Sequence, residues 1–150
     1  DGILPERIDS LRVGESILLG VSTVTREPIL GLHTDAITVS APVIECLCKP
    51  SVPRGTSAQD AFGQRPVFLD QGERLRAILA MGRQDVVPEG IVPVDPRVRV
   101  LGASSDHLVL DVEDLPRPPG LGEAIAFVPN YAATLAAFTS PYVEKQYIGG

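Results

Sequence analysis

The amino-acid sequence predicts an all-β domain, either a small barrel or a sandwich, with one short helix near its C-terminal end. Fourteen prolines and fourteen glycines interrupt the chain about every ten residues, which is the spacing of short strands joined by turns. Between them lie seven apolar runs, and this number of strands can close a small barrel. Only residues 130–141 have the composition of a helix.

The longest apolar run predicts a bent strand. Apolar and polar residues alternate from Ile37 to Val43, and after Pro42 the apolar side chains continue from Ile44 to Cys48. This change of facing predicts a bulge or bend in an edge position, because proline cannot donate a hydrogen bond within a central ladder. The expected strands cover residues 15–20, 36–49, 65–70, 75–82, 98–103, 106–112 and 123–129.

The predicted helix, "NYAATLAAFTSP", is rich in alanine, which has the highest helix propensity. Leu135 and Phe138 stand three residues apart, a helical spacing. Asn130 is placed to cap the first turn, and Pro141 ends the helix.

Length and composition indicate one folded domain over residues 1–150, large enough to bury about two thirds of its unfolded surface. A net charge of −6 argues against a nucleic-acid partner. The sequence has neither an apolar run of about 20 residues nor a signal peptide, so we expect a soluble, cytoplasmic protein. Because the chain begins at Asp1 without methionine, we also expect it to be part of a longer polypeptide.

Cys46 and Cys48 stand two residues apart in an expected strand, so their side chains point to the same face and cannot easily form a relaxed disulfide. The two histidines, His33 and His107, do not have zinc-site spacing. We therefore expect buried, unreactive thiols and no metal site.

The strand expected at 106–112 is preceded by polar side chains. Leu108 and Leu110 face one side and Val109 the other, which is typical of a half-buried strand. Residues 104–107, "SSDH", form either a turn whose side chains bond to backbone amides or part of a functional site. Successive strand residues point to opposite faces, so these residues cannot form a Ser-His-Asp triad and we do not expect a hydrolase.

Two further segments allow a structural and a functional interpretation. The loop "GTSAQDAFGQ" (55–64) is framed by glycines and is either a connection or a loop that carries function. Asn130 and Tyr131 provide either a helix cap with a packed ring or a phenol offered to a ligand near a helix N-terminus.

Five segments, taken in order, resemble the C-terminal half of the fold-type III pyridoxal-phosphate (PLP) racemases, and the alanine/ornithine racemase branch most closely. They are "LRVGESILLG", "KPSVPRG" with "QDAFG", "RAILAMGRQDV", "LGASSDHLVLDV" and "NYAATLAAFTSPYVEK". The resemblance covers nearly the whole chain. It implies a small Greek-key β-barrel with added strands and a short C-terminal helix.

The family resemblance also implies a cofactor and partners. In the family, an N-terminal α/β barrel carries the lysine that holds PLP, and the C-terminal domain completes the active site of the neighbouring subunit in a homodimer. Neither Lys49 nor Lys145 has a setting like that lysine, so the cofactor lysine is expected outside this chain.

The resemblance implies roles for individual residues. Asp106 matches an aspartate that reaches the partner's substrate pocket, and Ser105 replaces the methionine beside it. Asp60 occupies the place of the catalytic tyrosine, so we hypothesise that Asp60 is the second acid/base. Tyr131 matches a tyrosine near the cofactor phosphate, and Gly82 and Asp85 match a family segment that we interpret as structural.

The opposite assignment of the two carboxylates is also reasonable, because Asp60 and Asp106 together would suit a substrate with a distal ammonium group. We expect racemisation of ornithine or another basic amino acid ahead of alanine. The alternatives are another PLP-dependent reaction or a non-catalytic β-barrel that serves dimerisation or small-ligand binding.

Overall fold

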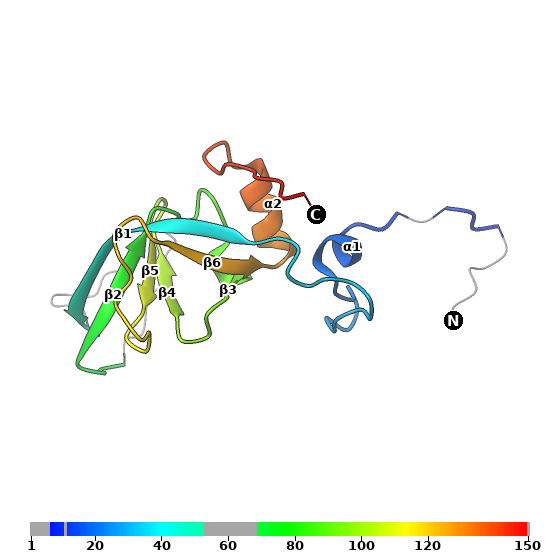
Figure 1. The fold of residues 1–150 in the computed structure, drawn as a ribbon. Helices are drawn as coiled ribbons and strands as arrows, with labels where there is room; N and C mark the ends of the chain where they lie inside the picture. Colours follow the sequence, from blue (N-terminus) through cyan, green and yellow to red (C-terminus); the bar gives the residue numbers. More distant parts are fainter. Residues whose placement is uncertain (1–6, 11, 53–68, 150) are drawn as a thin grey trace. The chain divides into compact units, whose positions relative to one another are not determined.

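The computed structural model describes residues 7–10, 12–52 and 69–149. The chain divides into two compact units, residues 1–37 and 38–150 (Figure 1). The second unit, the β unit, contains every described strand. The expectation that residues 1–150 form one domain of a longer two-domain enzyme stays a prediction.

The N-terminal unit contains the short helix α1 (Glu15–Leu19), so the prediction of a strand over 15–20 is wrong. The segment is a continuous apolar run, and such a run does not distinguish a strand from a helix by its period. Gly20 ends α1 in the left-handed conformation with φ of 66°. A Cβ at Gly20 would lie 2.2 Å from the backbone oxygen of His33, so only glycine fits this turn.

The β unit is one curled sheet of six antiparallel strands in the order β3-β6-β1-β2-β5-β4, which forms a nearly closed barrel (Figure 1). Strand β6, the last along the chain, pairs with β1, the first along the chain, as in Greek-key connections. The expected mainly β barrel with a C-terminal helix is therefore confirmed. The strands are β1 (Val39–Pro50), β2 (Glu73–Leu79), β3 (Ile91–Pro93), β4 (Arg99–Ala103), β5 (Leu108–Asp111) and β6 (Ala124–Pro129).

Five of the seven expected strands correspond to observed ones, with ends that differ by up to three residues. Besides helix α1, there are two further differences. The strand expected at 65–70 lies outside the described residues except for its last two positions, which are not in a strand. Strand β3 was not expected from the sequence, because it is only three residues long. It directly follows the short 3-10 helix η1 (Pro88–Gly90).

Strand β1 pairs with β6 from Val39 to Pro42 and with β2 from Val43 onward. The register shifts between Val43 and Glu45, so the predicted bulge is confirmed. The predicted edge position is wrong, because β1 has a neighbour on each side. Pro42 is tolerated because it lies where β1 changes partner, and its carbonyl still accepts a hydrogen bond from Ala80 N at 3.1 Å.

The core lies inside the barrel. Leu108 and Leu110 of β5 are fully buried, whereas Val109 between them is partly exposed, which confirms the predicted alternation. Leu108 pairs with Leu79 of β2, and Leu110 pairs with Ala77. Each fully buried leucine contributes roughly 1.5–3 kcal/mol to the free energy of unfolding. Phe127 of β6 is the largest fully buried side chain among the described residues.

Helix α2 (Tyr131–Thr139) packs against η1 and β6 (Figure 1). Its buried residues are Ala133, Thr134 and Ala137, whereas Leu135 and Phe138 are about half exposed. The helix therefore approaches the sheet through small side chains. The cap is as predicted, since Asn130 Oδ1 accepts from Ala133 N at 3.0 Å. Neither helix in the described ranges is long and apolar enough to cross a membrane.

The outer face of β2, β5 and β4 holds a group of ion pairs. The Nε and Nη2 atoms of Arg74 each donate to the Asp111 carboxylate at 2.9 Å. Arg99 Nη2 lies 3.6 Å from the same carboxylate. Burial raises the pKa of Asp111, but the Arg74 hydrogen bonds, the Glu113 N–H and the two arginine charges outweigh it and lower this pKa below its usual value.

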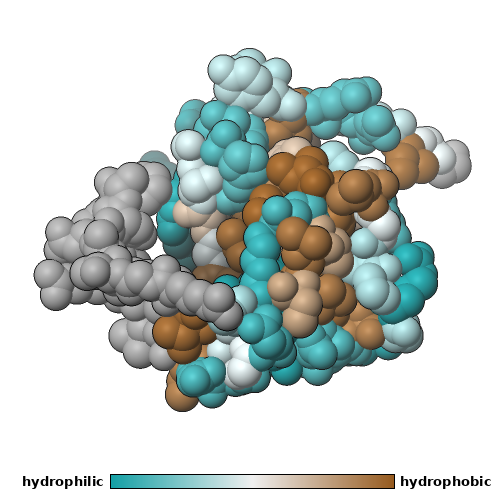
Figure 2. Space-filling view, turned by 90° about the vertical axis from the view of Figure 1, so that its left-hand side faces the viewer, coloured by the Kyte–Doolittle hydropathy of each residue, from teal (hydrophilic) through white to brown (hydrophobic). Residues whose placement is uncertain are grey.

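Apolar side chains are exposed on the outside of the β unit. Figure 2 shows the face at the β1–β2 end, where they gather between hydrophilic ones. Exposed apolar residues of the β unit include Ile44 and Leu47 of β1 and Leu101 of β4. Exposed patches of this kind occur at surfaces that meet another protein.

The Asp111→Asn substitution tests the Arg74 ion pair. We expect it to lower the free energy of unfolding by about 1–3 kcal/mol at pH 7, because Arg74 loses a charged partner. The lowered pKa means that Asp111 stabilises the fold above its unfolded pKa of about 3.9 and loses this effect as the pH falls through its folded pKa. Urea unfolding at pH 7 and near pH 2 should therefore show a smaller cost of the substitution in acid.

The matched control is Asp114→Asn, because Asp114 contacts Arg74 and Arg99 but its side chain is 54% exposed. We expect this substitution to cost at most about 1 kcal/mol. An equal cost of Asp111→Asn at both pH values would contradict the ion-pair explanation.

Candidate functional site

The candidate site centres on the turn between β4 and β5. Ser104 N donates to His107 O at 2.9 Å and closes the turn. His107 N donates to Ser104 Oγ at 3.1 Å, as the structural interpretation of these polar residues predicted. The turn also carries the two residues expected at the substrate, Ser105 and Asp106.

Three side chains converge on a single oxygen of Asp106. The hydroxyls of Ser104 and Ser105 both donate to Oδ1 at 3.1 Å. The Nδ1 atom of His107 lies 3.1 Å from the same oxygen. No other described residue donates a hydrogen bond to Oδ2, and the Asp106 side chain is 54% exposed.

The pKa of Asp106 is lowered, first by the Ser104 hydrogen bond, then by the Ser105 hydrogen bond, and further by the His107 charge. Asp106 is thus an anion at neutral pH, with one oxygen open to a further donor. A carboxylate in this state is suited to pair with a cation and poorly suited to donate a proton.

Residues 82–86 form the turn that follows β2, and their backbone bonds to the Asp106 turn. Arg83 N donates to Ser104 O and Gln84 N to Ser105 O, each at 2.9 Å. A Cβ at Gly82 would lie 2.4 Å from Asp106 N and 2.5 Å from the carbonyl of Ser105. Gly82 is therefore required by close backbone contact, which agrees with its structural interpretation.

Arg83 links the 82–86 turn to η1. Its guanidinium donates to Glu89 of η1 at 2.8 Å. The same hydrogen bond is the main cause that lowers the pKa of Glu89. The ion pair links the 82–86 turn to η1, against which α2 packs.

Tyr131 begins α2 and is about half exposed. The residue before it is fixed, because Asn130 N donates to Gly90 O at 2.7 Å and the Asn130 side chain occupies the space that a Cβ at Gly90 would need. The first turn of α2 holds no acidic side chain, which suits the approach of an anion to the helix N-terminus.

Among the described residues, no hydrogen bond or ion pair joins Tyr131 to Asp106. The Asp106 turn is linked through Gly82 and Asp85 to Ser140, just after α2. Tyr131 lies at the opposite end of this helix, about 13 Å from Ser140 along the helix axis. Asp60 and the whole loop 55–64 lie outside the described residues.

Asp85 and Ser140 form the part of the site that sequence reasoning missed. Their side chains meet at 3.1 Å although 55 positions separate them in the chain. Asp85 was noted only through the family segment, and Ser140 carried no signal in the sequence beyond its place near the end of the predicted helix. Both residues are buried.

The two cysteines are free. Cys46 packs against the core, where burial is the first cause that raises the pKa of its thiol. The prediction that both thiols are buried is wrong for Cys48, which is exposed near Glu73. The bulge in β1 turns Cys46 toward the core. Cys48 stands two residues nearer the end of the strand and is exposed there.

Comparison with known proteins identifies the relatives of this chain. An ornithine racemase of Acetoanaerobium sticklandii and a lysine racemase of Thermotoga maritima are each 45% identical to it over 147 residues, 98% of its length. This chain is homologous to amino-acid racemases. The predicted resemblance to the alanine/ornithine racemase family is thus confirmed.

The chain spans 42% and 41% of the length of these two curated relatives. No family model matches it. Among solved structures, an alanine racemase from Acinetobacter baumannii is 19% identical with a TM-score of 0.44, covering 83% of this chain and 36% of that one.

Gly82→Ala tests the contact between the two turns. The added methyl group would overlap backbone atoms of Ser105 and Asp106, so we expect the Asp106 turn to shift at a cost of about 1–3 kcal/mol in the free energy of unfolding. Urea unfolding measures the cost, and amide hydrogen exchange at His107 reports the shift. Gly102→Ala is the control, because a Cβ there has no atom within 4 Å. Identical behaviour of the two variants would rule out the contact.

Proposed function

We propose that this chain is the C-terminal domain of a PLP-dependent amino-acid racemase and that it presents Asp106 to the substrate in the active site of the neighbouring subunit. The observation that carries this proposal is the exposed carboxylate of Asp106, whose pKa is lowered by the two serine hydroxyls and whose Oδ2 has no donor among the other described residues. The identity with ornithine and lysine racemases supports it.

The charge of Asp106 favours a basic substrate over alanine. Ornithine and lysine carry a distal ammonium group, and an ammonium–carboxylate hydrogen bond is about twice as strong as one between neutral groups. Ser104 and Ser105 stabilise the carboxylate without neutralising it, because they are uncharged donors. Asp106 therefore binds and orients the substrate, and Ser105 holds Asp106.

Asp60 is the proposed second acid/base. Racemisation needs a proton donor or acceptor on each face of the α-carbon, and the cofactor lysine serves one face. A carboxylate can serve the other if its surroundings raise its pKa toward neutrality. The lowered pKa of Asp106 favours this division of roles, since Asp106 stays ionised.

The residues of the β unit are compatible with PLP. Tyr131 is exposed at the start of a helix without an acidic first turn, and we assign it to the cofactor phosphate. The lysine that holds the cofactor lies outside this chain. PLP, when bound, supplies the electron sink that makes the α-proton of an amino acid removable.

The proposed partners are an N-terminal α/β barrel domain and a second copy of the enzyme in a homodimer. The relatives are more than twice as long as this chain, which leaves room for such a barrel. The outward residues Ile44, Leu47 and Leu101 supply apolar surface for contact with another domain.

Asp106→Asn in the full-length protein tests the substrate role. We expect KM for lysine and ornithine to rise about 10- to 100-fold with a smaller effect on kcat, because the ammonium group loses a charged partner. Steady-state racemisation of lysine, ornithine and alanine measures this. Asp95→Asn is the control, since Asp95 lies in another turn and pairs with Arg97. Equal KM values in the two variants would remove the proposed role, and no racemisation by the wild-type protein would favour a non-catalytic barrel.

Asp60→Asn tests the proton-transfer role. We expect kcat to fall by a factor of about 10² to 10⁴ with little change in KM, because the amide cannot exchange a proton. The same assay measures both constants, and exchange of the α-proton with deuterated solvent separates the two faces. A large rise in KM with kcat preserved would instead assign Asp60 to binding.

A further inference from the structure

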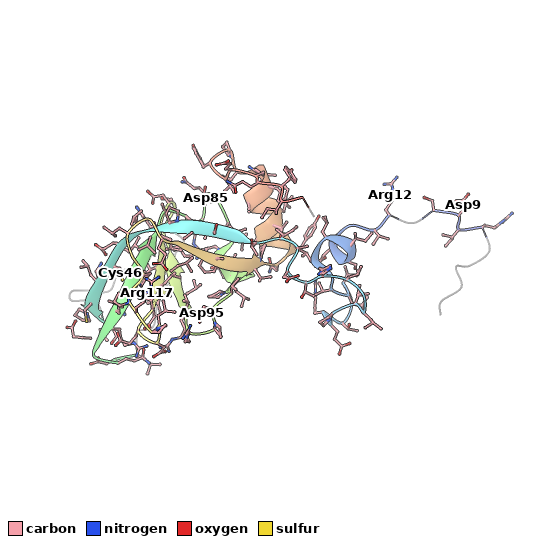
Figure 3. All side chains as sticks on the ribbon, in the orientation of Figure 1. Asp9, Arg12, Cys46, Asp85, Asp95 and Arg117 are labelled. Carbon is pink, nitrogen blue, oxygen red and sulfur yellow. The ribbon has the colours of Figure 1, made fainter. Side chains whose placement is uncertain are left out.

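Asp85 is a buried carboxylate that joins two distant parts of the β unit. Its position is labelled in Figure 3. Its Oδ2 accepts a hydrogen bond from Gly82 N at 3.1 Å, and its Oδ1 accepts one from Ser140 Oγ at 3.1 Å. Only 6% of the residue is exposed. Each carboxylate oxygen therefore holds a different segment.

Ser140, on one side of Asp85, is itself fixed. Its backbone N–H donates to Ala136 O at 2.9 Å and continues the bonding of α2. Its Oγ accepts from Tyr142 N at 3.2 Å, and its carbonyl accepts from Lys145 Nζ at 2.6 Å. The hydroxyl that donates to Asp85 is thus held by the end of the helix and by the segment that follows it.

Gly82, on the other side of Asp85, lies directly under the Asp106 turn. There is no room for a Cβ between Gly82 and the backbone of Ser105 and Asp106. The position of Gly82 therefore determines how far the backbone of Asp106 extends from the barrel. A continuous path runs from Ser140 through Asp85 and Gly82 to Asp106.

We propose that Asp85 and Ser140 are positioning residues for substrate recognition, which set the place of the Asp106 carboxylate relative to the substrate's distal ammonium group. This inference rests on the proposed function of Asp106. Neither residue touches the substrate. Their effect on selectivity arises because a small displacement of a positioned group is costly.

A merely structural role would have a different signature. Loss of a buried network that only stabilises the fold lowers the amount of folded enzyme and affects every amino-acid substrate equally. A positioning role changes KM for lysine and ornithine while leaving alanine, which has no distal ammonium group, nearly unaffected. The ratio of kcat/KM for lysine to that for alanine separates the two roles.

Substitutions in the full-length enzyme test the proposal. In Asp85→Ala, which removes both hydrogen bonds, we expect the lysine-to-alanine ratio to fall about tenfold through KM for lysine. Asp85→Asn should restore most of the ratio, because Oδ1 can accept from Gly82 N and Nδ2 can donate to Ser140 Oγ. Ser140→Ala should give a lysine-to-alanine ratio between those of Asp85→Ala and Asp85→Asn. It is the main test if Asp85→Ala does not fold.

Thr139→Ala is the matched control for Ser140→Ala, because it removes a hydroxyl that bonds only within α2, to the carbonyls of Leu135 and Ala136. It should leave the ratio within about twofold of wild type. In the double variant Asp85→Ala with Asp106→Asn, the lysine-to-alanine ratio should fall no further than in Asp106→Asn alone. Both substitutions act on the same interaction, between Asp106 and the distal ammonium group.

Two results would overturn the positioning role: an unchanged lysine-to-alanine ratio in both Asp85→Ala and Ser140→Ala, or additive losses in the double variant. Asp106→Asn, measured in parallel, keeps the two proposals distinct. An unchanged ratio in Asp106→Asn refutes the proposed function. If the lysine-to-alanine ratio falls as expected in Asp106→Asn but is unchanged in the Asp85 and Ser140 variants, the positioning role alone is refuted.

Faster amide exchange at Arg83 and Gln84 in Asp85→Ala shows independently of activity that Asp85 holds the two turns together.

Discussion

The pairing of strand β1 on both of its sides is the constraint on which the β unit depends. Its first residues bond to β6 and the remainder bond to β2, and a bulge separates the two registers. Strand β6 continues directly into α2, and β2 continues into the 82–86 turn. The two segments that meet at Asp85 are therefore each attached to a strand that β1 holds in place.

Asp106 and Asp111 have lowered pKa values for different reasons. Asp111 is buried against Arg74 and Arg99, so its charge is neutralised and its contribution is to stability. Asp106 is exposed, and its first two stabilising partners are the neutral hydroxyls of Ser104 and Ser105. Neutral donors keep a carboxylate ionised without cancelling its charge. A negative potential thus remains at Asp106 for a ligand, whereas little remains at Asp111.

The sequence predicted the features that depend on local patterns. Alternation correctly placed Leu108 and Leu110 in the core, and the Asn130 cap and the alanines correctly predicted α2. An apolar run without alternation did not distinguish a helix from a strand at 15–20. The internal position of β1 and the Asp85–Ser140 bond depend on pairing between distant segments, which no local pattern encodes. The family motifs pointed to Asp106, whose role stays a proposal, but no sequence pattern indicates that Ser104, Ser105 and His107 all contact its Oδ1.

The turn that carries Asp106 is constrained from two directions, by its own closing bond between Ser104 and His107 and by the backbone of residues 82–84 beneath it. An inserted or deleted residue between Ala103 and Leu108 would break both sets of contacts and shift the register of β4 against β5. Loop length is therefore not free to vary here. Within the proposed function, selectivity changes through exchange of side chains on this fixed backbone, so a library that randomises residues 104–107 at constant length is the natural design for altering the substrate.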